Sequence, residues 1–200
     1  MRITMSFIAI MLTVVMAKPS LANERLNVLG IYPGMSVEEM KALPPLNPQG
    51  NLLCTHDPES NGIPLMDHAR RSRGNNPDIS WCTIIEKNRN DGVRLAITTE
   101  LHITRADVHI YLIQVTGQRV IATASFVFPS HDHDAIVHAY TAKYGPPSGR
   151  RENEVYWDGP HGDLLSIKRM PSGRSHVLIL GIVPFLQMRQ SQETFVPPRL

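Results

Sequence analysis

The chain has few of the residues and motifs on which specialised chemistry depends. Its 200 residues include two cysteines, two tryptophans and only 6% aromatic residues in all. It lacks the Gly-x-Ser-x-Gly nucleophile elbow, the His-Glu-x-x-His zinc pair and the Gly-x-x-x-x-Gly-Lys phosphate loop. The sequence therefore gives no support for these three routes to catalysis, and a non-catalytic protein without a cofactor is favoured over an enzyme.

An excess of basic charge is also missing. The formal net charge is +2, and Arg2 and Lys18 near the N-terminus account for it, because the rest of the chain carries 18 basic and 18 acidic residues. Proteins that bind nucleic acid normally need a clear basic excess to displace counterions from phosphates. No nucleic-acid partner is expected.

Long apolar runs are confined to the N-terminus. A mostly apolar run from Ile3 to Ala17 is broken by Lys18-Pro19, and the small residues Ser20 and Ala22 follow at the positions typical of a cleavage site. The pattern predicts a cleavable signal peptide over residues 1–22 and a periplasmic or secreted product. The alternative is a retained membrane anchor, although about 15 apolar residues fall slightly short of a bilayer span. Once the signal is removed, no stable membrane span is expected.

Cysteine is limited to the pair Cys54 and Cys82, which in an exported chain is first interpreted as a disulfide. The bond would close a loop of about 28 residues and contribute roughly 3 to 4 kcal/mol of stability if chain entropy dominates. The alternative is a metal site that joins both cysteines to His56 and His68. Their spacing matches no zinc-finger pattern, and an oxidising compartment favours the disulfide.

Two helices are expected, and a glycine or proline signal ends each of them. Ser36 followed by Glu39 is the capping-box pattern, and Pro44-Pro45 stop this helix about two turns later. The second helix is expected to begin at a Ser130 cap and to end at Gly145.

Seven other segments are rich in β-branched and aromatic residues and are joined by short turns, which is typical of antiparallel strands. The prediction is an α+β fold: an antiparallel β-sheet of about seven strands with two main helices packed on one face. A tandem helix-plus-sheet repeat is one way to build it. The segments are 80–87, 93–103, 107–115, 118–128, 154–158, 163–169 and 175–183.

One domain is expected over residues 23–183, because a chain of this length suits a single core; two lobes, 23–128 and 129–183, are the alternative. The tail 184–200 is rich in Gln, Arg and Pro and is expected to be partly mobile. Residues 46–79 show no sustained periodicity of apolar residues, which predicts an irregular stretch with a short helix near 65–71. Long loops of this kind in compact domains are usually functional or mobile.

The same order of features occurs in both halves of the chain. An apolar segment is followed by a serine-capped helix, two prolines that end the helix, and then strands. The first half carries Gly34-Met35-Ser36 followed by Glu38-Glu39, and the second carries Lys143-Tyr144-Gly145-Pro146-Pro147. These segments resemble the β-lactamase-inhibitor-like proteins and the small outer-membrane assembly lipoproteins. The resemblance implies a tandem α+β periplasmic protein that binds another exported or envelope protein. The chain departs from the lipoproteins in lacking a lipidation cysteine.

A histidine-rich segment at the start of the second helix carries residue types that bind metals. Asp134 and His138 are one turn apart on one helical face, and His131 precedes them. Acidic side chains are also favoured at a helix start by its dipole, so a solvated helix terminus is the simpler interpretation. Two alternative functions follow: a metal-dependent or hydrolytic enzyme that uses residues 131–138, or a small-ligand carrier with an apolar cavity.

Five residues are candidates for a binding surface. Trp81, Tyr156 and Trp157 are large aromatic side chains, and Arg70 and Arg71 lie together in the irregular stretch. Aromatic and arginine side chains dominate the energetics of protein interfaces. The leading hypothesis is an exported, non-catalytic protein-binding or scaffold module.

Overall fold

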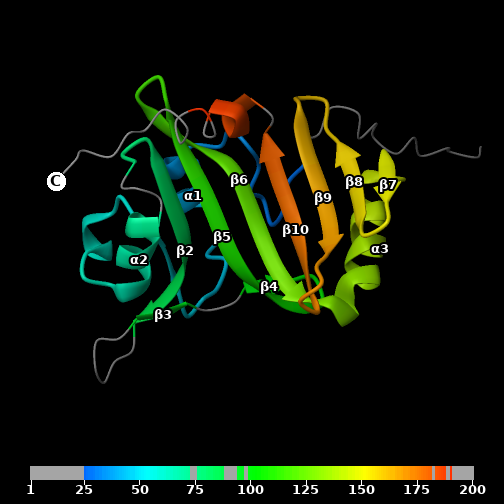
Figure 1. Cartoon of the computed structure of the whole chain (residues 1–200), viewed down its shortest axis with the longest axis horizontal. Helices are drawn as coiled ribbons and strands as arrows, with labels where there is room; N and C mark the ends of the chain where they lie inside the picture. The colour runs from blue at the N-terminus through cyan, green and yellow to red at the C-terminus, as the bar shows by residue number, and fades with distance from the viewer. Residues whose placement is uncertain are drawn as a thin grey trace, which may run out of the picture.

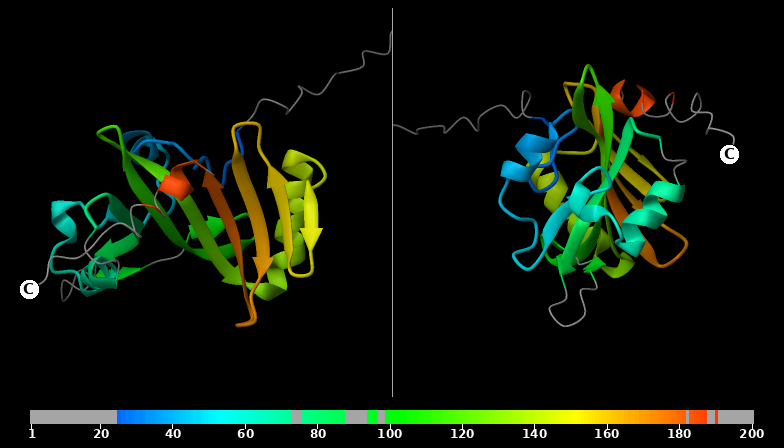
Figure 2. Two further views of the ribbon diagram at one scale, coloured as in Figure 1. Left: turned by 45° about the horizontal axis from the view of Figure 1, so that its top comes forward. Right: turned by 90° about the vertical axis from the view of Figure 1, so that its left-hand side faces the viewer.

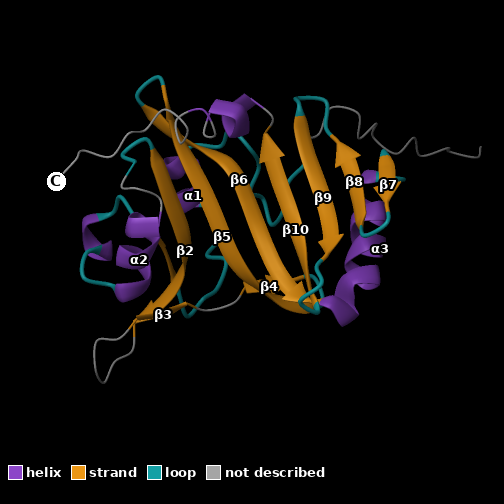
Figure 3. Ribbon diagram, viewed as in Figure 1, coloured by secondary structure: helices purple, strands orange, loops and turns teal. Residues whose placement is uncertain are grey.

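The computed structural model describes residues 25–72, 76–87, 94–96, 99–181, 183–187 and 190. The expected signal peptide over 1–22 and the last ten residues of the expected tail lie outside this part. The described chain is an α+β fold built on one ten-stranded sheet, with helices on both of its faces (Figures 1 and 3).

The strands run in the order β1-β2-β5-β6-β10-β9-β8-β7, with β3 paired to β2 and β4 paired to β5, and every pairing is antiparallel. Helix α1 precedes the meander β1, β2, β5, β6, and helix α3 precedes the meander β7 to β10. The last strands of the two meanders, β6 and β10, pair with each other at the centre of the sheet. The strands are β1 (Asn51–Cys54), β2 (Ile79–Lys87), β3 (Arg94–Ala96), β4 (Thr99–Leu101), β5 (Thr104–Val115), β6 (Gln118–Pro129), β7 (Gly149–Arg151), β8 (Glu154–Asp158), β9 (Asp163–Arg169) and β10 (Arg174–Gly181).

The expected strand count of about seven is too low, for three local reasons. β1 has four residues and lies in a Pro- and Asn-rich stretch, too short to show an alternating pattern. β7 has three residues, of which two are arginines, and it forms only because β8 turns back onto it. The single segment expected over 93–103 contains two short strands, β3 and β4, and residues 104–106 continue into β5 instead of forming a turn.

Helix α1 (Val37–Ala42) begins where the capping-box pattern predicts. The Glu39 backbone N–H donates to Ser36 Oγ at 3.1 Å, and the Ser36 N–H donates to Glu39 Oε2 at 2.8 Å. The second of these bonds stabilises the carboxylate and lowers the pKa of Glu39 below its usual range. The reciprocal bonds satisfy two backbone donors that the first helical turn would otherwise leave without partners.

Replacing Ser36 with alanine is expected to lower the free energy of unfolding by about 1 kcal/mol, because the Glu39 backbone N–H loses its hydroxyl acceptor. Urea denaturation followed by circular dichroism measures the change. The neighbouring exposed substitution Glu38→Gln is the control and should stay within about 0.5 kcal/mol of the wild type. Equal midpoints for the two variants would show that the capping box contributes nothing to the fold.

Helix α3 (His133–Tyr144) starts differently from the expectation. Ser130 belongs to a short 3-10 turn, η3 (Ser130–Asp132), and its hydroxyl lies 3.2 Å from Ser175 Oγ instead of capping the helix. The helix ends as expected at Gly145, whose φ of 84° is a conformation that favours glycine.

One buried cluster includes residues from both sides of residue 128. It joins Met35 and Met40 beside and in α1, Ile136 and Tyr140 of α3, and residues on one face of the sheet such as Phe126. The chain segment before α1 is also fixed to α3. Asn27 N–H donates to Tyr144 Oη at 2.8 Å, Tyr144 Oη donates to Asn27 O at 2.7 Å, and Lys143 Nζ donates to Asn27 Oδ1 at 2.9 Å.

The opposite face of the sheet is covered only in part by described elements. Met66 and Ala69 of helix α2 (Pro64–Ser72), with Ile63 just before the helix, pack against Leu53, Trp81 and Ile85. Phe185 packs on a smaller cluster around Ile113. Figure 2 shows α2 and the helical turn at 183–187 on one side of the sheet and α1 on the other. The described residues of the stretch 46–79 therefore include a structured cover over β2.

Candidate functional site

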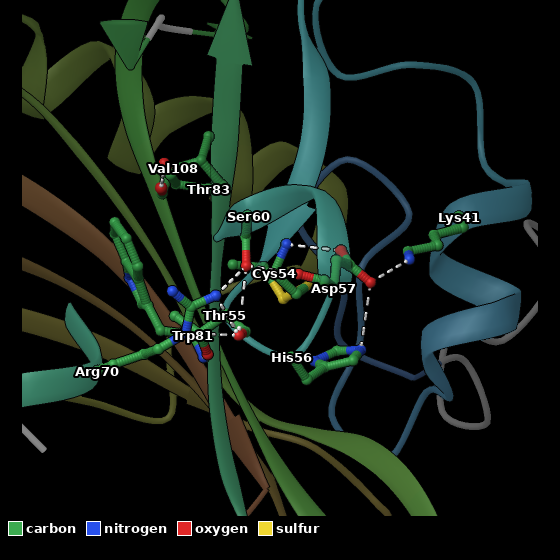
Figure 4. Close-up of a disulfide and its surroundings, with 11 residues drawn as sticks. Lys41, Cys54, Thr55, His56, Asp57, Ser60, Arg70, Trp81, Thr83 and Val108 are labelled. Atoms are coloured by element: carbon green, nitrogen blue, oxygen red, sulfur yellow. Dashed lines mark hydrogen bonds and ion pairs between the residues drawn. A yellow bond between two sulfur atoms is a disulfide. The ribbon is translucent and has the colours of Figure 1, made fainter. Parts of the chain in front are cut away.

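The disulfide predicted from the sequence is present and links two neighbouring strands. Cys54 of β1 and Cys82 of β2 are direct partners in the strand register, and their sulfur atoms are bonded at 2.03 Å (Figure 4). Both residues are fully buried. The bond fixes the point at which β1 leaves the sheet and the following turn begins.

The turn after Cys54 is organised around the carboxylate of Asp57. Its Oδ2 accepts a bond from the Cys54 backbone N–H at 2.8 Å, and its Oδ1 lies 3.0 Å from Lys41 Nζ of α1 and 3.6 Å from His56 Nε2 (Figure 4). The turn is thus tied to β1 on one side and to α1 on the other.

Arg70 of α2 holds the same turn from the other direction. Its Nε and Nη2 donate to the Thr55 carbonyl oxygen at 2.9 and 2.8 Å, Nη2 also donates to the Ser60 hydroxyl, and Nη1 pairs with Asp67 at 2.5 Å. Most of its donors and its charge are therefore used inside the protein. Arg70 acts as a structural clamp between α2 and the turn.

Replacing Arg70 with alanine is expected to lower the free energy of unfolding by about 2 kcal/mol, because the clamp is lost and Asp67 is left without its cation. The adjacent substitution Arg71→Ala removes the same charge from an exposed side chain and should change stability by less than about 0.5 kcal/mol. Urea denaturation of the two variants side by side checks this. An equal loss of stability in both variants would show that the effect comes from removing a positive charge from α2 and not from losing the clamp.

A cavity of about 450 Å³ opens beside this clamp, at the edge of β2 beyond the end of β1. Of its described lining residues, three can carry positive charge and none is acidic. The lining residues are Thr55, His56, Ala69, Arg70, Asn76, Pro77, Ile79, Ser80 and Arg119.

Arg119 reaches this cavity from the start of β6. Ser80 pairs with Leu112, and Leu112 pairs with Ile121, which is two residues after Arg119, so Arg119 and Ser80 share one face of the sheet. The Nε atom of Arg119 is buried and has no hydrogen-bond partner, and its guanidinium forms no ion pair with a described residue. Arg119 is therefore an uncompensated cation in the cavity wall.

His56 supplies the second unsatisfied nitrogen. Its Nδ1 is buried without a hydrogen-bond partner, while Nε2 faces Asp57. Burial is the main reason that the pKa of His56 lies below its usual range; Arg119 and Lys41 lower it further, while Asp57 and Glu38 oppose the shift. The imidazole is accordingly neutral at neutral pH, and an added negative charge in the cavity would favour its protonation.

A second cavity, of about 270 Å³, lies below Pro44 and Pro45 on the α1 side of the sheet. Its lining combines apolar residues such as Ile31 and Met40 with Lys41, Asn47 and Asn51. None of the buried polar side-chain atoms without a hydrogen-bond partner in the described residues belongs to its lining.

The structure does not assemble the metal site suggested by the histidine-rich segment. The His131 side chain is 78% exposed beside Asp132, His138 is exposed, and Asp134 pairs with Arg169 at 2.8 Å. The alternative cysteine–histidine site is wrong, because the two sulfur atoms are bonded to each other and His68 lies exposed on α2. Cys54 does lie near His56 and Asp57, but a disulfide sulfur is no thiolate ligand.

A serine and a histidine do meet at the start of α3, although not as a hydrolytic site. His133 Nδ1 lies 3.1 Å from Ser175 Oγ, and Ser175 has no solvent exposure. A nucleophile needs access to substrate, so this pair is a buried polar contact that joins α3 to β10. Burial also lowers the pKa of His133, which keeps the contact neutral.

The five residues proposed from sequence as a binding surface do not lie on one surface. Trp81 is 4% exposed and stacks on His109, and Trp157 is 2% exposed and donates from Nε1 to Gly145 O at 3.0 Å. Tyr156 is half-buried on the distant strand β8. Both tryptophans are core residues because strand alternation directs their side chains onto opposite covered faces of the sheet, under α2 and α3.

The comparisons with known proteins add no relative. No family model, no curated protein and no solved structure matches the chain.

Sequence reasoning missed Arg119 as a candidate and considered His56 only as a metal ligand. Arg119 lies beside the hairpin turn at Thr116-Gly117, where an arginine is ordinarily a solvated surface residue. Its place in the cavity wall becomes visible only from the tertiary contacts that bring the disulfide-linked turn after β1 beside the start of β6.

Proposed function

We propose that this protein is an exported, non-catalytic binding module that recognises another exported or envelope protein through the cavity beside the disulfide. The observation that carries the proposal is Arg119, whose unpaired guanidinium has a buried Nε in a wall without a described acidic residue. Enclosing a charged group without a partner costs free energy, and that cost is recovered when a bound partner supplies the opposite charge.

The architecture supports the same role. A helix followed by a four-stranded meander occurs twice, and the two meanders join through β6 and β10. The resemblance to the β-lactamase-inhibitor-like and outer-membrane assembly proteins likewise implies a tandem α+β architecture, and those proteins act by binding other proteins. Because a fold can carry many functions, the architecture is a secondary argument and the cavity is the primary one.

The disulfide and the predicted signal peptide support a periplasmic or secreted location. Structural disulfides persist in oxidising compartments and are rare in the cytosol. None of the helices that the structure describes has the length and apolar character needed to cross a bilayer. Intact-mass measurement of protein isolated from the cell envelope or medium should give a chain beginning at Asn23; an uncut chain in the cytosol would contradict the proposed location.

The function is tested by differential capture. Mature wild-type protein and the variants Arg119→Gln and Arg151→Gln are immobilised and exposed to an envelope extract of the source organism. Arg151 is an exposed arginine on β7, remote from the cavity, and serves as the matched control. We expect a protein that is retained by wild type and Arg151→Gln and lost with Arg119→Gln.

The captured protein is then purified and titrated into each variant by calorimetry. Loss of a central interface arginine should weaken its affinity at least about tenfold, whereas Arg151→Gln should leave it within about twofold. Recovery of the same proteins by all three forms, or of none by any, would reject the cavity as a protein-recognition site.

A further inference from the structure

We propose that the group entering the cavity is a single oxyanion, a carboxylate or a phosphate, bound by the fork of Arg119. That the oxyanion is an acidic group of a partner protein rests on the proposed function. That the ligand is an oxyanion is argued from the cavity alone. The Nε–H and a neighbouring Nη–H of a guanidinium point in parallel and match the two oxygens of a carboxylate or phosphate. Arg119 lines the cavity, and its Nε has no hydrogen-bond partner. Because this Nε is enclosed, the side chain must turn toward the cavity for both donors of the fork to meet the anion.

The remaining lining residues select for negative charge. Arg70 is held by Thr55, Ser60 and Asp67, so it forms a fixed part of the wall, and its charge is largely offset by Asp67. No acidic side chain is among the described lining residues. A cationic ligand would therefore meet Arg119 without compensation, whereas an anion would satisfy it.

The dimensions favour a small acidic group over an extended ligand. A cavity of about 450 Å³ lies toward the lower end of the range for pockets that enclose small molecules. An aspartate or glutamate side chain, a chain carboxy-terminus or an inorganic phosphate falls within this size.

His56 makes anion binding sensitive to pH. The charged groups that act on its ring are Asp57 beside it, Arg119 from β6, and Lys41 and Glu38 from α1. The pKa of His56 is depressed in the free protein, and an anion beside the ring raises it, so binding takes up a proton. The affinity for a carboxylate should accordingly rise as the pH falls from 7.5 to 5.5.

The test follows the side-chain Nε–Hε signals of arginine by nuclear magnetic resonance while sodium acetate or inorganic phosphate is added at constant ionic strength. In the wild type we expect a saturable shift of the Arg119 signal and of the Ser80 and Thr55 amides. Arg119→Gln should weaken binding at least about tenfold, and Arg119→Lys should weaken it less, because charge remains while the fork is lost. Arg151→Gln is the control and should bind as the wild type does.

The two probes distinguish the sources of the oxyanion. Tighter binding of acetate supports a protein carboxylate, and tighter binding of phosphate supports a free or esterified phosphate. Shifts that grow linearly and equal those caused by sodium chloride, or that persist in Arg119→Gln, would overturn the oxyanion site. The folded amide pattern of each variant shows that a loss of binding is not a loss of structure.

The pH dependence is measured with acetate in the wild type and in His56→Gln. Binding that tightens toward pH 5.5 in the wild type and stays constant in His56→Gln places His56 beside the anion; equal slopes would remove it from the site. The oxyanion inference and the proposed function can fail separately. If acetate binds but no protein partner depends on Arg119, only the proposed protein-binding function is rejected. If a partner depends on Arg119 but neither acetate nor phosphate displaces it, only the oxyanion site is rejected.

Discussion

Replacing Cys54 and Cys82 together with alanine is expected to lower the free energy of unfolding by about 3 to 4 kcal/mol. The bond closes a separation of 28 residues, and breaking it releases conformational freedom in the unfolded chain. Both side chains are fully buried, so the alanine variant also loses apolar contacts. Urea denaturation monitored by tryptophan fluorescence measures the effect, because Trp81 belongs to β2 and directly precedes Cys82.

Wild-type protein denatured in the presence of a reductant is the control for this result, since it loses the bond and keeps both cysteine side chains. Most of the loss of unfolding free energy should also appear in this reduced wild-type protein. The anion affinity of the cavity should also fall in the double variant, because Thr55 and His56 directly follow Cys54. Identical denaturation midpoints with and without reductant would show that the bond does not stabilise the fold.

Replacing Met66 with alanine is expected to cost about 2 to 5 kcal/mol. Met66 is fully buried between α2 and the face of the sheet that carries Leu53 and Trp81, and its truncation leaves a void under the helix. The same denaturation measurement applies. Because α2 also positions Arg70, the variant should widen or disorder the wall of the cavity and weaken acetate binding.

Leu65 provides the matched control, since it is the preceding residue of the same helix and is 36% exposed. Leu65→Ala should change stability by less than about 1 kcal/mol. A similar small change in Met66→Ala would mean that α2 does not pack against the sheet in solution. The stretch 46–79 would then be an open loop, as its sequence suggested.

The sequence was most informative where a local pattern determines local structure. The capping box placed the start of α1 at Ser36, and the segments 154–158 and 163–169 match β8 and β9 residue for residue. The disulfide followed from compartment and cysteine number alone. In each case the signal depends on neighbouring residues or on composition, and needs no knowledge of tertiary contacts.

The parts that sequence did not predict depend on contacts between distant segments. β1 exists because the disulfide and β2 hold four residues extended, and η3 replaces the Ser130 cap because that hydroxyl meets Ser175. No sequence pattern around Arg119 indicates that it lines a cavity. Its place in the cavity wall requires the turn after β1 and the start of β6 to converge, and these two segments are about 60 residues apart in the chain.

The attachment of Asn27 to Tyr144 and Lys143 joins the start of the described chain to the end of its third helix. The contacting residues are more than 110 positions apart, so these bonds cannot form until α3 has been synthesised. The segment before α1 therefore stays unattached while the strands of the first meander are already available to pair. The last step in assembling the amino-terminal part of the fold depends on residues from the second half of the chain.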